Sequence, residues 1–554
     1  MNMHKAPGII KWIVFPVLPA FLALSDLSYT RAELSAGGFF QKALLYAFLF
    51  LLLLFLSDKL YFFLKRPAPA RRWHRFLTFS RKNVLMLSAL LFLIDLGYLY
   101  VYRPGTCGYD TVNQILDLVT GMDPLPFSWA SWQENVSALM NDHHPVATTL
   151  IFTLFYRIGT AVGHSNIGIF IYALFQAGCL SLLFGCIICY MDRLGIPKLF
   201  ALLSFLFCCS PVIAFFSIAM IKDSLFSVVF VLFFLQYAEI VSKALEKKTV
   251  SRKALLFLLF LSTVIALLNK KGMYIALVSD LALLPVLPGG RTKLRVVCCA
   301  LMPVFVITIL MGKLLFPLFG IFPGGKQEAL GFTFQQTAGI LLEDPESFSE
   351  EDRALFFRLI NIPPEELEST YNPALTNAVK DYYCLHTSED DLAAYLKLWL
   401  SQVLRHPLAA LRILLTVNGG YFAPVKTANV YTSAAYYEYL GAFRQPDSSL
   451  ALRNTVTGIY QTLTQTPGLS VFFLDALSLF WFPCVTAFLL QRHGREGAIV
   501  CMVPLAANMV FLILGPVCWT RYGLCQIFTL PVWASLPFVF CPRPDDMPQT
   551  DRIP

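Results

Sequence analysis

Long apolar runs are the feature that most constrains what this chain can fold into. Twelve of them approach or reach the roughly 20 residues that a helix needs to cross the hydrocarbon of a bilayer. Of all 554 residues, 57% are hydrophobic and only 14% are charged, whereas a soluble protein is about 25% charged. A transmembrane β-barrel would show short segments of alternating polarity instead. The sequence therefore predicts an all-α polytopic membrane protein.

The loops between these runs predict a topology. The loop 65–82 is the most basic of them, and Lys and Arg gather in cytoplasmic loops. Placing this loop inside puts the segment that begins at 103 outside. The twelve predicted spans are 8–26, 42–64, 83–102, 166–190, 198–219, 224–241, 254–269, 273–288, 296–317, 470–491, 497–516 and 522–541.

A further apolar run, 146–163, decides the parity of the topology. If it crossed the membrane, the basic loops 243–253 and 291–295 would lie outside. If it does not cross, these loops lie inside and both termini are cytoplasmic, as the positive-inside rule favours. The run also carries Thr148, Thr149, Thr153 and Arg157, which make it more polar than a lipid-facing span. We therefore expect an interfacial helix on the outer surface.

This topology divides the chain into three regions. Residues 1–318 form an N-terminal membrane domain with an outer loop at 103–165, and residues 470–554 form C-terminal membrane helices with a short cytoplasmic tail. Between them, 319–469 is a large extracytoplasmic region. A loop of this length is rarely structureless, so we expect it to be helical and to pack on the membrane domain without a core of its own.

The net charge, the placement of the cysteines and the absence of nucleotide-binding motifs limit the classes of function that the chain can have. The net charge of +8 comes from basic residues in short loops, so it sets orientation and does not indicate a nucleic-acid partner. Neither a P-loop nor a Rossmann fingerprint is present, which argues against direct use of ATP or another soluble nucleotide. Most of the fourteen cysteines lie in apolar runs, whereas Cys107 and Cys384 lie in polar segments and would pair only in an oxidising compartment.

The first outer loop holds the candidate catalytic residues. Asp110 follows a Pro-Gly turn directly after a span. It is either the N-cap of the next helix or a general base or metal ligand at the membrane edge. His143 and His144 precede the run 146–163. They are either a polar helix start or a contact to a phosphate or leaving group, with Asp142 available to orient a histidine.

Candidate binding residues lie in other outer connections. The pair 222–223 and the hairpin 269–272 are polar, as tight outer turns require, but the second is basic although it lies outside. A phosphate ligand would explain this, because Lys binds phosphate as a point charge. Arg521 beside aromatic residues is either an interfacial anchor or a clamp for an anionic head group. The candidates are Lys222, Asp223, Asn269, Lys270, Lys271, Arg521 and Tyr522, together with Tyr371 and Lys380 of the large outer region.

The chain resembles the GT-C superfamily of membrane glycosyltransferases, and in particular a group of uncharacterised bacterial membrane proteins near it. The resemblance is carried by Asp110 in the first outer loop, by His144 with the following proline, by the pair 222–223, by the hairpin 269–272 and by Arg521 with Tyr522. It implies a polyprenyl-phosphate-linked sugar as donor, an acidic base or metal ligand at Asp110 and a juxtamembrane helix at 146–163. The paired acidic motif common in the superfamily is absent around Asp110. A divalent metal there is one option, and the cofactor stays unassigned.

The expected function is glycosyl transfer at the extracytoplasmic face of a bacterial plasma membrane. The donor would be a polyprenyl-phosphate sugar, the acceptor a cell-surface or lipid-linked glycan, and membrane lipids the surroundings. One alternative is a twelve-span transporter or a flippase for lipid-linked glycans, and another is a polymerase or ligase of surface polysaccharide. Transporters usually show internal repeats and broken helices near the midplane, whereas the polar residues of this chain gather at one face, which favours the enzyme.

Overall fold

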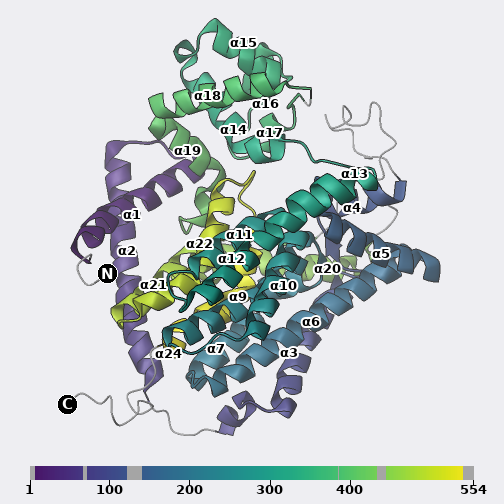
Figure 1. Ribbon diagram of the computed structural model, residues 1–554, viewed down its shortest axis with the longest axis vertical. Coiled ribbons are helices and arrows are strands. Elements are labelled where there is room, and N and C mark those ends of the chain that lie inside the picture. Colours follow the sequence, from purple (N-terminus) through teal and green to yellow (C-terminus); the bar gives the residue numbers. More distant parts are fainter. Residues whose placement is uncertain (1–6, 67–71, 121–139, 385, 433–443, 541–554) are drawn as a thin grey trace.

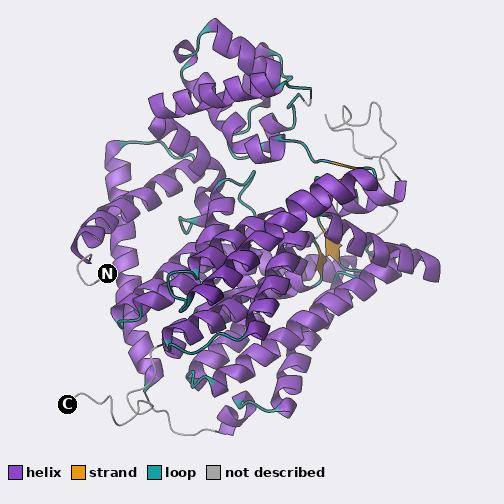
Figure 2. Cartoon of the chain, viewed as in Figure 1, coloured by secondary structure: helices purple, strands orange, loops and turns teal. Residues whose placement is uncertain are grey.

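The computed structural model describes residues 7–66, 72–120, 140–384, 386–432 and 444–540 (Figure 1). In these ranges the chain is almost entirely helical, with four strands of two residues each (Figure 2). Seven helical stretches of the described chain are long and apolar enough to cross a membrane, so this is an integral membrane protein. They are α2 (Ala36–Lys65), α3 (Arg81–Val101), α6 (Ser165–Arg193), α9 (Lys222–Leu245), α12 with the turns after it (Gly290–Leu318), the stretch Glu496–Ile513 ending in α22 (Val503–Ile513), and the stretch Thr520–Phe540 with α23 (Leu524–Trp533) and α24 (Leu536–Phe540).

The count rises to eight if a pair of helices that meet at a bend forms one span. Length and apolarity alone therefore identify fewer spans in the described residues than the twelve expected. The two helices, α7 (Lys198–Cys208) and α8 (Pro211–Ser217), meet at an angle of 54° around a break of a few residues. The other expected spans coincide with four further helices, which are α1 (Pro7–Tyr29), α10 (Arg252–Leu268), α11 (Lys270–Ala282) and α21 (Phe482–Arg492).

The basic loops gather at one end of the helix bundle. The Asp192 carboxylate accepts hydrogen bonds from the backbone N–H of Phe79, at 2.9 Å, and from Lys198, at 2.5 Å. The segment that precedes α3 therefore contacts the loop between α6 and α7. His493 lies 3.5 Å from Asp58 near the end of α2, which leads into the same region. The described loop residues 72–82, 192–198 and 492–495 therefore lie at one end of the bundle, as expected from their charge.

The region 319–469 has a hydrophobic core of its own, so the expectation that it lacks one is wrong. Its helices are amphipathic, and apolar side chains between 334 and 413 pack against one another. These helices lie at the top of the molecule in Figure 1. Phe334, Phe356 and Tyr395 are fully buried at the centre of this core. We call residues 327–413 the cap. Its helices are α14 (Gln327–Glu343), α15 (Glu350–Leu359), α16 (Leu367–Thr370), α17 (Asn377–Lys380), α18 (Glu389–Arg405) and the start of α19 (Pro407–Asn418).

The rest of that region belongs to the membrane domain. Tyr421, Phe422 and Tyr460 are buried in the main core, beyond the end of α19. The 319–469 region therefore divides after about residue 413, and α20 (Leu450–Gln465) packs with the bundle.

The 146–163 run forms α5 (Val146–Val162), which makes a tight hairpin with α6. A Cβ on Gly168 would lie 1.7 Å from the carbonyl oxygen of Phe155, so only glycine allows this approach. Three threonines of α5, Thr148, Thr149 and Thr153, are buried against the protein, where the Gln114 amide donates to the first two. The exposed face carries Arg157 and Thr160 beside Leu150 and Leu154. The buried threonines therefore add nothing to the polarity of the exposed face, whereas Arg157 and Thr160 do.

Two parallel bridges of two residues tie distant loops together. Strand β1 (Thr106–Cys107) pairs with β3 (Ala219–Met220), and β2 (Met140–Asn141) pairs with β4 (Ile321–Phe322). The first bridge joins the start of α4 (Tyr109–Thr120) to the start of α9, and the second joins the histidine segment to the start of the cap.

Candidate functional site

The first bridge places Asp110 beside Lys222. Asp110 comes three residues after β1, and Lys222 comes two residues after β3. The Thr111 hydroxyl donates to the carbonyl of Met220 at 2.6 Å and locks the two loops together. Lys222 Nζ then donates to Asp110 Oδ2 at 2.8 Å. Asp110 is the second residue of α4 rather than its N-cap, and its carboxylate contacts cations, so the capping interpretation is wrong.

Arg521, from the segment before α23, contacts the same carboxylate oxygen. Its Nη1 lies 3.3 Å from Asp110 Oδ2, and its side chain is only 6% exposed. The guanidinium also faces the rings of Trp519 and Tyr522, at 4.7 and 4.8 Å from their centroids. Burial opposes the charge of Asp110, but Arg521 and Lys222 outweigh it and hold the pKa of this carboxyl well below its ordinary value.

A second buried network, which the sequence analysis missed, positions Arg521. The hydroxyl of Thr520 donates to Asp475, at 2.8 Å, and the same carboxylate pairs with Lys426. Asn429 accepts from the backbone N–H of Thr520 at 2.8 Å. The segment after α19 therefore holds the backbone that carries Arg521, and it does so by contacts that no local motif encodes.

The two histidines complete the cluster around Lys222. His144 Nδ1 lies 3.0 Å from Lys222 Nζ, and because an ammonium only donates, this nitrogen accepts and the ring proton belongs on Nε2. The His143 ring stacks edge-on against His144 with centroids 4.3 Å apart. Burial lowers the pKa of His143 to about 4, and burial with the nearby Lys222 lowers the pKa of His144, so both rings are neutral at pH 7.

The cap contributes an ion pair to this cluster. Lys380 Nζ lies 2.5 and 2.6 Å from the two carboxylate oxygens of Glu328, and its side chain is only 4% exposed. Glu328 in turn lies 4.0 Å from His143 Nδ1. Burial opposes the charge of Glu328, but Lys380 outweighs it and lowers the pKa of the carboxyl. Lys380 therefore acts through Glu328, a residue that the sequence analysis missed because one Glu in a polar stretch carries no signal.

The hairpin 269–272 lies beside the cluster, but its two lysines make different contacts. Lys271 Nζ donates to the backbone carbonyl of Tyr522 at 2.6 Å, so it supports the Arg521 segment. Lys270 is 53% exposed and lies 3.5 Å from Asp142. Asp142 thus contacts Lys270 and the backbone N–H of Gly324, just before the cap, rather than orienting a histidine.

Below them, two of the candidate residues bind each other. The Asn269 amide donates to Asp223 Oδ1 at 3.0 Å, and both side chains are buried. This hydrogen bond joins the start of α9 to the start of α11, and it keeps Lys222 and the hairpin at one level.

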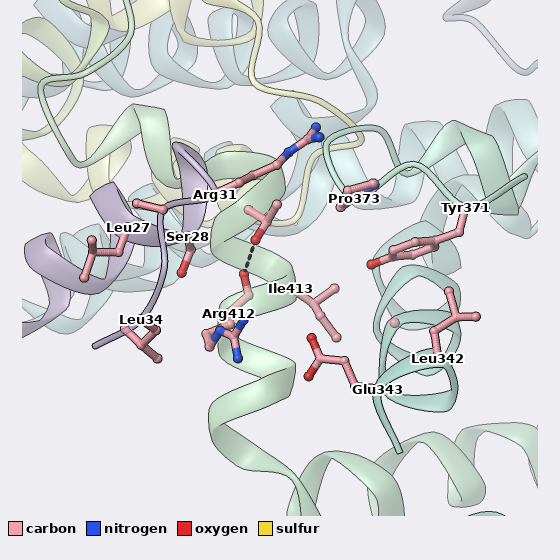
Figure 3. A pocket seen from close by; sticks show the side chains of 13 residues that line it. Leu27, Ser28, Arg31, Leu34, Leu342, Glu343, Tyr371, Pro373, Arg412 and Ile413 are labelled. Carbon is pink, nitrogen blue, oxygen red and sulfur yellow. Dashed lines mark hydrogen bonds between the residues drawn. The ribbon is translucent and has the colours of Figure 1, made fainter. Parts of the chain in front are cut away.

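Tyr371 is the one candidate that lies elsewhere. It lines a cavity at the opposite end of α14, beside Arg31 and Glu343 (Figure 3). Cys107 and Cys384 are both free, so the optional disulfide is absent. In the described part of the chain, no three His, Cys, Asp or Glu side chains are grouped as metal ligands. Two cations contact Asp110, so this arrangement of charges does not fit a divalent cation at that carboxylate.

These observations define a helical integral membrane protein with a largely buried ion cluster, to which the loop after α3, the start of α9, the segment before α23 and the cap all contribute. The chain belongs to DUF6020, a family of unknown function, and the match covers residues 64–540. No curated protein and no solved structure matches it.

Proposed function

We propose that this protein is a GT-C-like glycosyltransferase that uses a polyprenyl-phosphate-linked sugar at the extracytoplasmic face of a bacterial plasma membrane. The observation that carries the proposal is the contact of one carboxylate, Asp110, with two cations, Lys222 and Arg521, whose side chains are 16% and 6% exposed. This is a base beside a ready-made site for a phosphate. The cluster lies at the end of the bundle away from the basic loops, which corresponds to the outer face by the positive-inside rule.

The path of the chain supports a twelve-span topology. Helix α9 begins at Lys222 in the cluster and ends near residue 245, which packs against Gly497 at the basic end. Helix α10 returns to the cluster at Asn269. The chain then leaves along α11, and α12 carries it back toward β4, beside the histidine segment. Short helices such as α10 and α11 thus act as membrane spans between the two ends of the bundle. Helix α5 is an outer juxtamembrane helix in this topology.

The mechanism follows from competition for the two cations. When the donor binds, its phosphate takes positions beside Lys222 and Arg521, which now contact Asp110. Once the cations pair with phosphate, the carboxylate loses part of the stabilisation that lowers its pKa, so it becomes a better base. Donor binding therefore activates Asp110.

In the transfer step, the same groups accept the proton and stabilise the leaving group. The acceptor hydroxyl oxygen forms a bond to the anomeric carbon while the bond from that carbon to the phosphate oxygen breaks. Asp110 takes the hydroxyl proton, and polyprenyl phosphate leaves as an anion beside Lys222 and Arg521. Stabilising the charge on the leaving group is usually the largest electrostatic contribution in such transfers.

The histidines and the cap position the cations rather than exchange protons. His144 accepts from Lys222 and so holds the ammonium group at the cluster. The pair Glu328–Lys380 packs behind His143 and connects the cap to this arrangement.

Two measurements test the proposal. Purified protein should bind farnesyl phosphate, and Lys222→Gln or Arg521→Gln should weaken binding at least tenfold, whereas Lys397→Gln, an exposed lysine of α18, should not. A deletion strain should lose a sugar from its surface glycans, and the Lys222→Gln gene should not restore it. Wild-type affinity in the Lys222 and Arg521 variants, or unchanged glycans in the deletion strain, would contradict the proposal.

A flippase for lipid-linked glycans is the second candidate, and one observation favours it. The α7–α8 pair is bent by 54°, and broken helices are typical of transporters. A flippase would move the intact lipid-linked sugar without cleaving it. Release of free polyprenyl phosphate by purified protein therefore distinguishes the enzyme from the flippase.

A further inference from the structure

A cavity of about 300 Å³ lies where the cap meets the end of α1, apart from the Asp110 cluster (Figure 3). The cavity and the Asp110 cluster lie at opposite ends of α14, because Glu328 near its start belongs to the cluster and Glu343 at its end lines the cavity. Fifteen residues of α-helix span about 22 Å. The volume is at the lower end of the range for small-ligand sites.

The cavity gathers polar groups that lack partners. Arg31, Arg412 and Glu343 line it, and their side chains form no hydrogen bond or ion pair with any other residue that the structure describes. The Ser28 hydroxyl, also in the lining, is buried without a hydrogen-bond partner. Arg31 and Glu343 are exposed and Arg412 is half-buried, so these three side chains are open to a ligand from solution. Buried polar groups in native proteins are nearly always satisfied, so the buried Ser28 hydroxyl indicates a polar partner inside the cavity.

The backbone of Arg31 places its side chain at the cavity. This residue follows the end of α1 with φ of +54°, the left-handed conformation of a helix C-terminus, in which its N–H donates to the carbonyl of Ser28 and the N–H of Ala32 donates to the carbonyl of Leu27. In Figure 3 the Arg31 side chain extends toward the loop that holds Pro373, across the cavity from Arg412.

The chemistry of the lining specifies the ligand. Two arginines and one glutamate leave a net charge of +1, and Arg binds phosphate or carboxylate through paired N–H donors. Glu343 accepts hydrogen bonds from hydroxyl groups, and the Tyr371 hydroxyl points into the cavity. Burial raises the pKa of Tyr371, so this hydroxyl keeps its proton and donates.

We propose that this cavity is a second binding site, for an anionic group that carries neighbouring hydroxyls, such as a sugar phosphate or a glycerol-phosphate head group. The anion pairs with Arg31 and Arg412, and the hydroxyls bind Glu343, Ser28 and Tyr371. The assignment needs no transfer at Asp110 and goes beyond the proposed function.

The test uses the full chain in nanodiscs, with Lys222→Gln in every protein so that phosphate binding at Asp110 does not contribute. Glucose 6-phosphate is titrated by calorimetry in neutral phosphatidylcholine nanodiscs. In a second arm, phosphatidylglycerol replaces part of the lipid and the thermal unfolding midpoint is measured. Arg31→Gln and Arg412→Gln remove the cations, and Arg157→Gln, at an exposed arginine of α5, is the matched control.

We expect glucose 6-phosphate to bind, with a loss of at least tenfold in both cavity variants and none in the control. If only phosphatidylglycerol stabilises the protein, and both cavity variants abolish that effect, the site is supported and a lipid supplies the group. If neither probe distinguishes the cavity variants from the control, the site is refuted. Because Lys222 is changed throughout, a failure of glycosyl transfer leaves this result unaffected.

Discussion

Replacing Asp110 by Asn separates the roles that the ion cluster gives this carboxylate. The substitution keeps the shape and one accepting oxygen but removes the charge beside Lys222 and Arg521, whose side chains are 16% and 6% exposed. Removing one partner of a buried ion pair costs about 3–5 kcal/mol. Because Asn still accepts from Lys222, we expect about 3 kcal/mol. This exceeds the roughly 0.5–2 kcal/mol of a lost helix cap.

The same substitution should improve phosphate binding. On the proposed mechanism, a phosphate competes with Asp110 for the two cations in the wild-type protein, whereas in Asp110→Asn the cations are free to pair with it. If most of the lost 3 kcal/mol is recovered on binding, farnesyl phosphate should bind on the order of 100-fold more tightly. Sugar transfer should fall by about 100- to 10,000-fold, as expected for the loss of a general base.

The assays are thermal unfolding with and without farnesyl phosphate, equilibrium binding, and transfer measured as release of polyprenyl phosphate. Asp447→Asn, at an exposed residue, is the control and should behave as wild type. The reasoning is refuted if Asp110→Asn unfolds at the wild-type temperature and binds farnesyl phosphate no more tightly. Tighter binding with undiminished transfer would keep the phosphate site but remove Asp110 as the base.

Two further predictions concern the groups behind the cluster. His143 has a pKa of about 4 in the folded protein and about 6.5 when unfolded, so its contribution to stability is complete above pH 6.5 and is lost as the pH falls toward 4. The loss in the free energy of unfolding is up to about 3 kcal/mol. In His143→Gln the thermal unfolding midpoint should therefore depend less on pH between 7.5 and 4. An unchanged pH dependence would contradict this. Glu328→Gln should leave buried Lys380 without its counter-charge and increase hydrogen exchange in α14 and α17. The double variant with Lys380→Met should reverse much of this, and equal exchange in both variants would show that the ion pair does not hold the cap.

Membrane class, helix positions and most of the candidate site followed from the sequence. Run length and hydrophobicity are local properties, so they indicate spans without knowledge of neighbours. Alternation of spans then predicts which loops share a face, which is why Lys222, Asn269 and Arg521 were placed together before their contacts were known. Helices too short to pass a length criterion, such as α10 and α11, limit how far this reasoning can count spans.

Contacts between distant residues were decided only by the tertiary structure. Asp110 and Lys222 are 112 positions apart, and a bridge of two residues, too short to leave a sequence pattern, joins their loops. The cap core, the pair Glu328–Lys380 and the cavity at Tyr371 likewise depend on how amphipathic helices pack. Periodicity predicts that a helix has an apolar face, but the partner for that face is chosen by the packing of the whole chain.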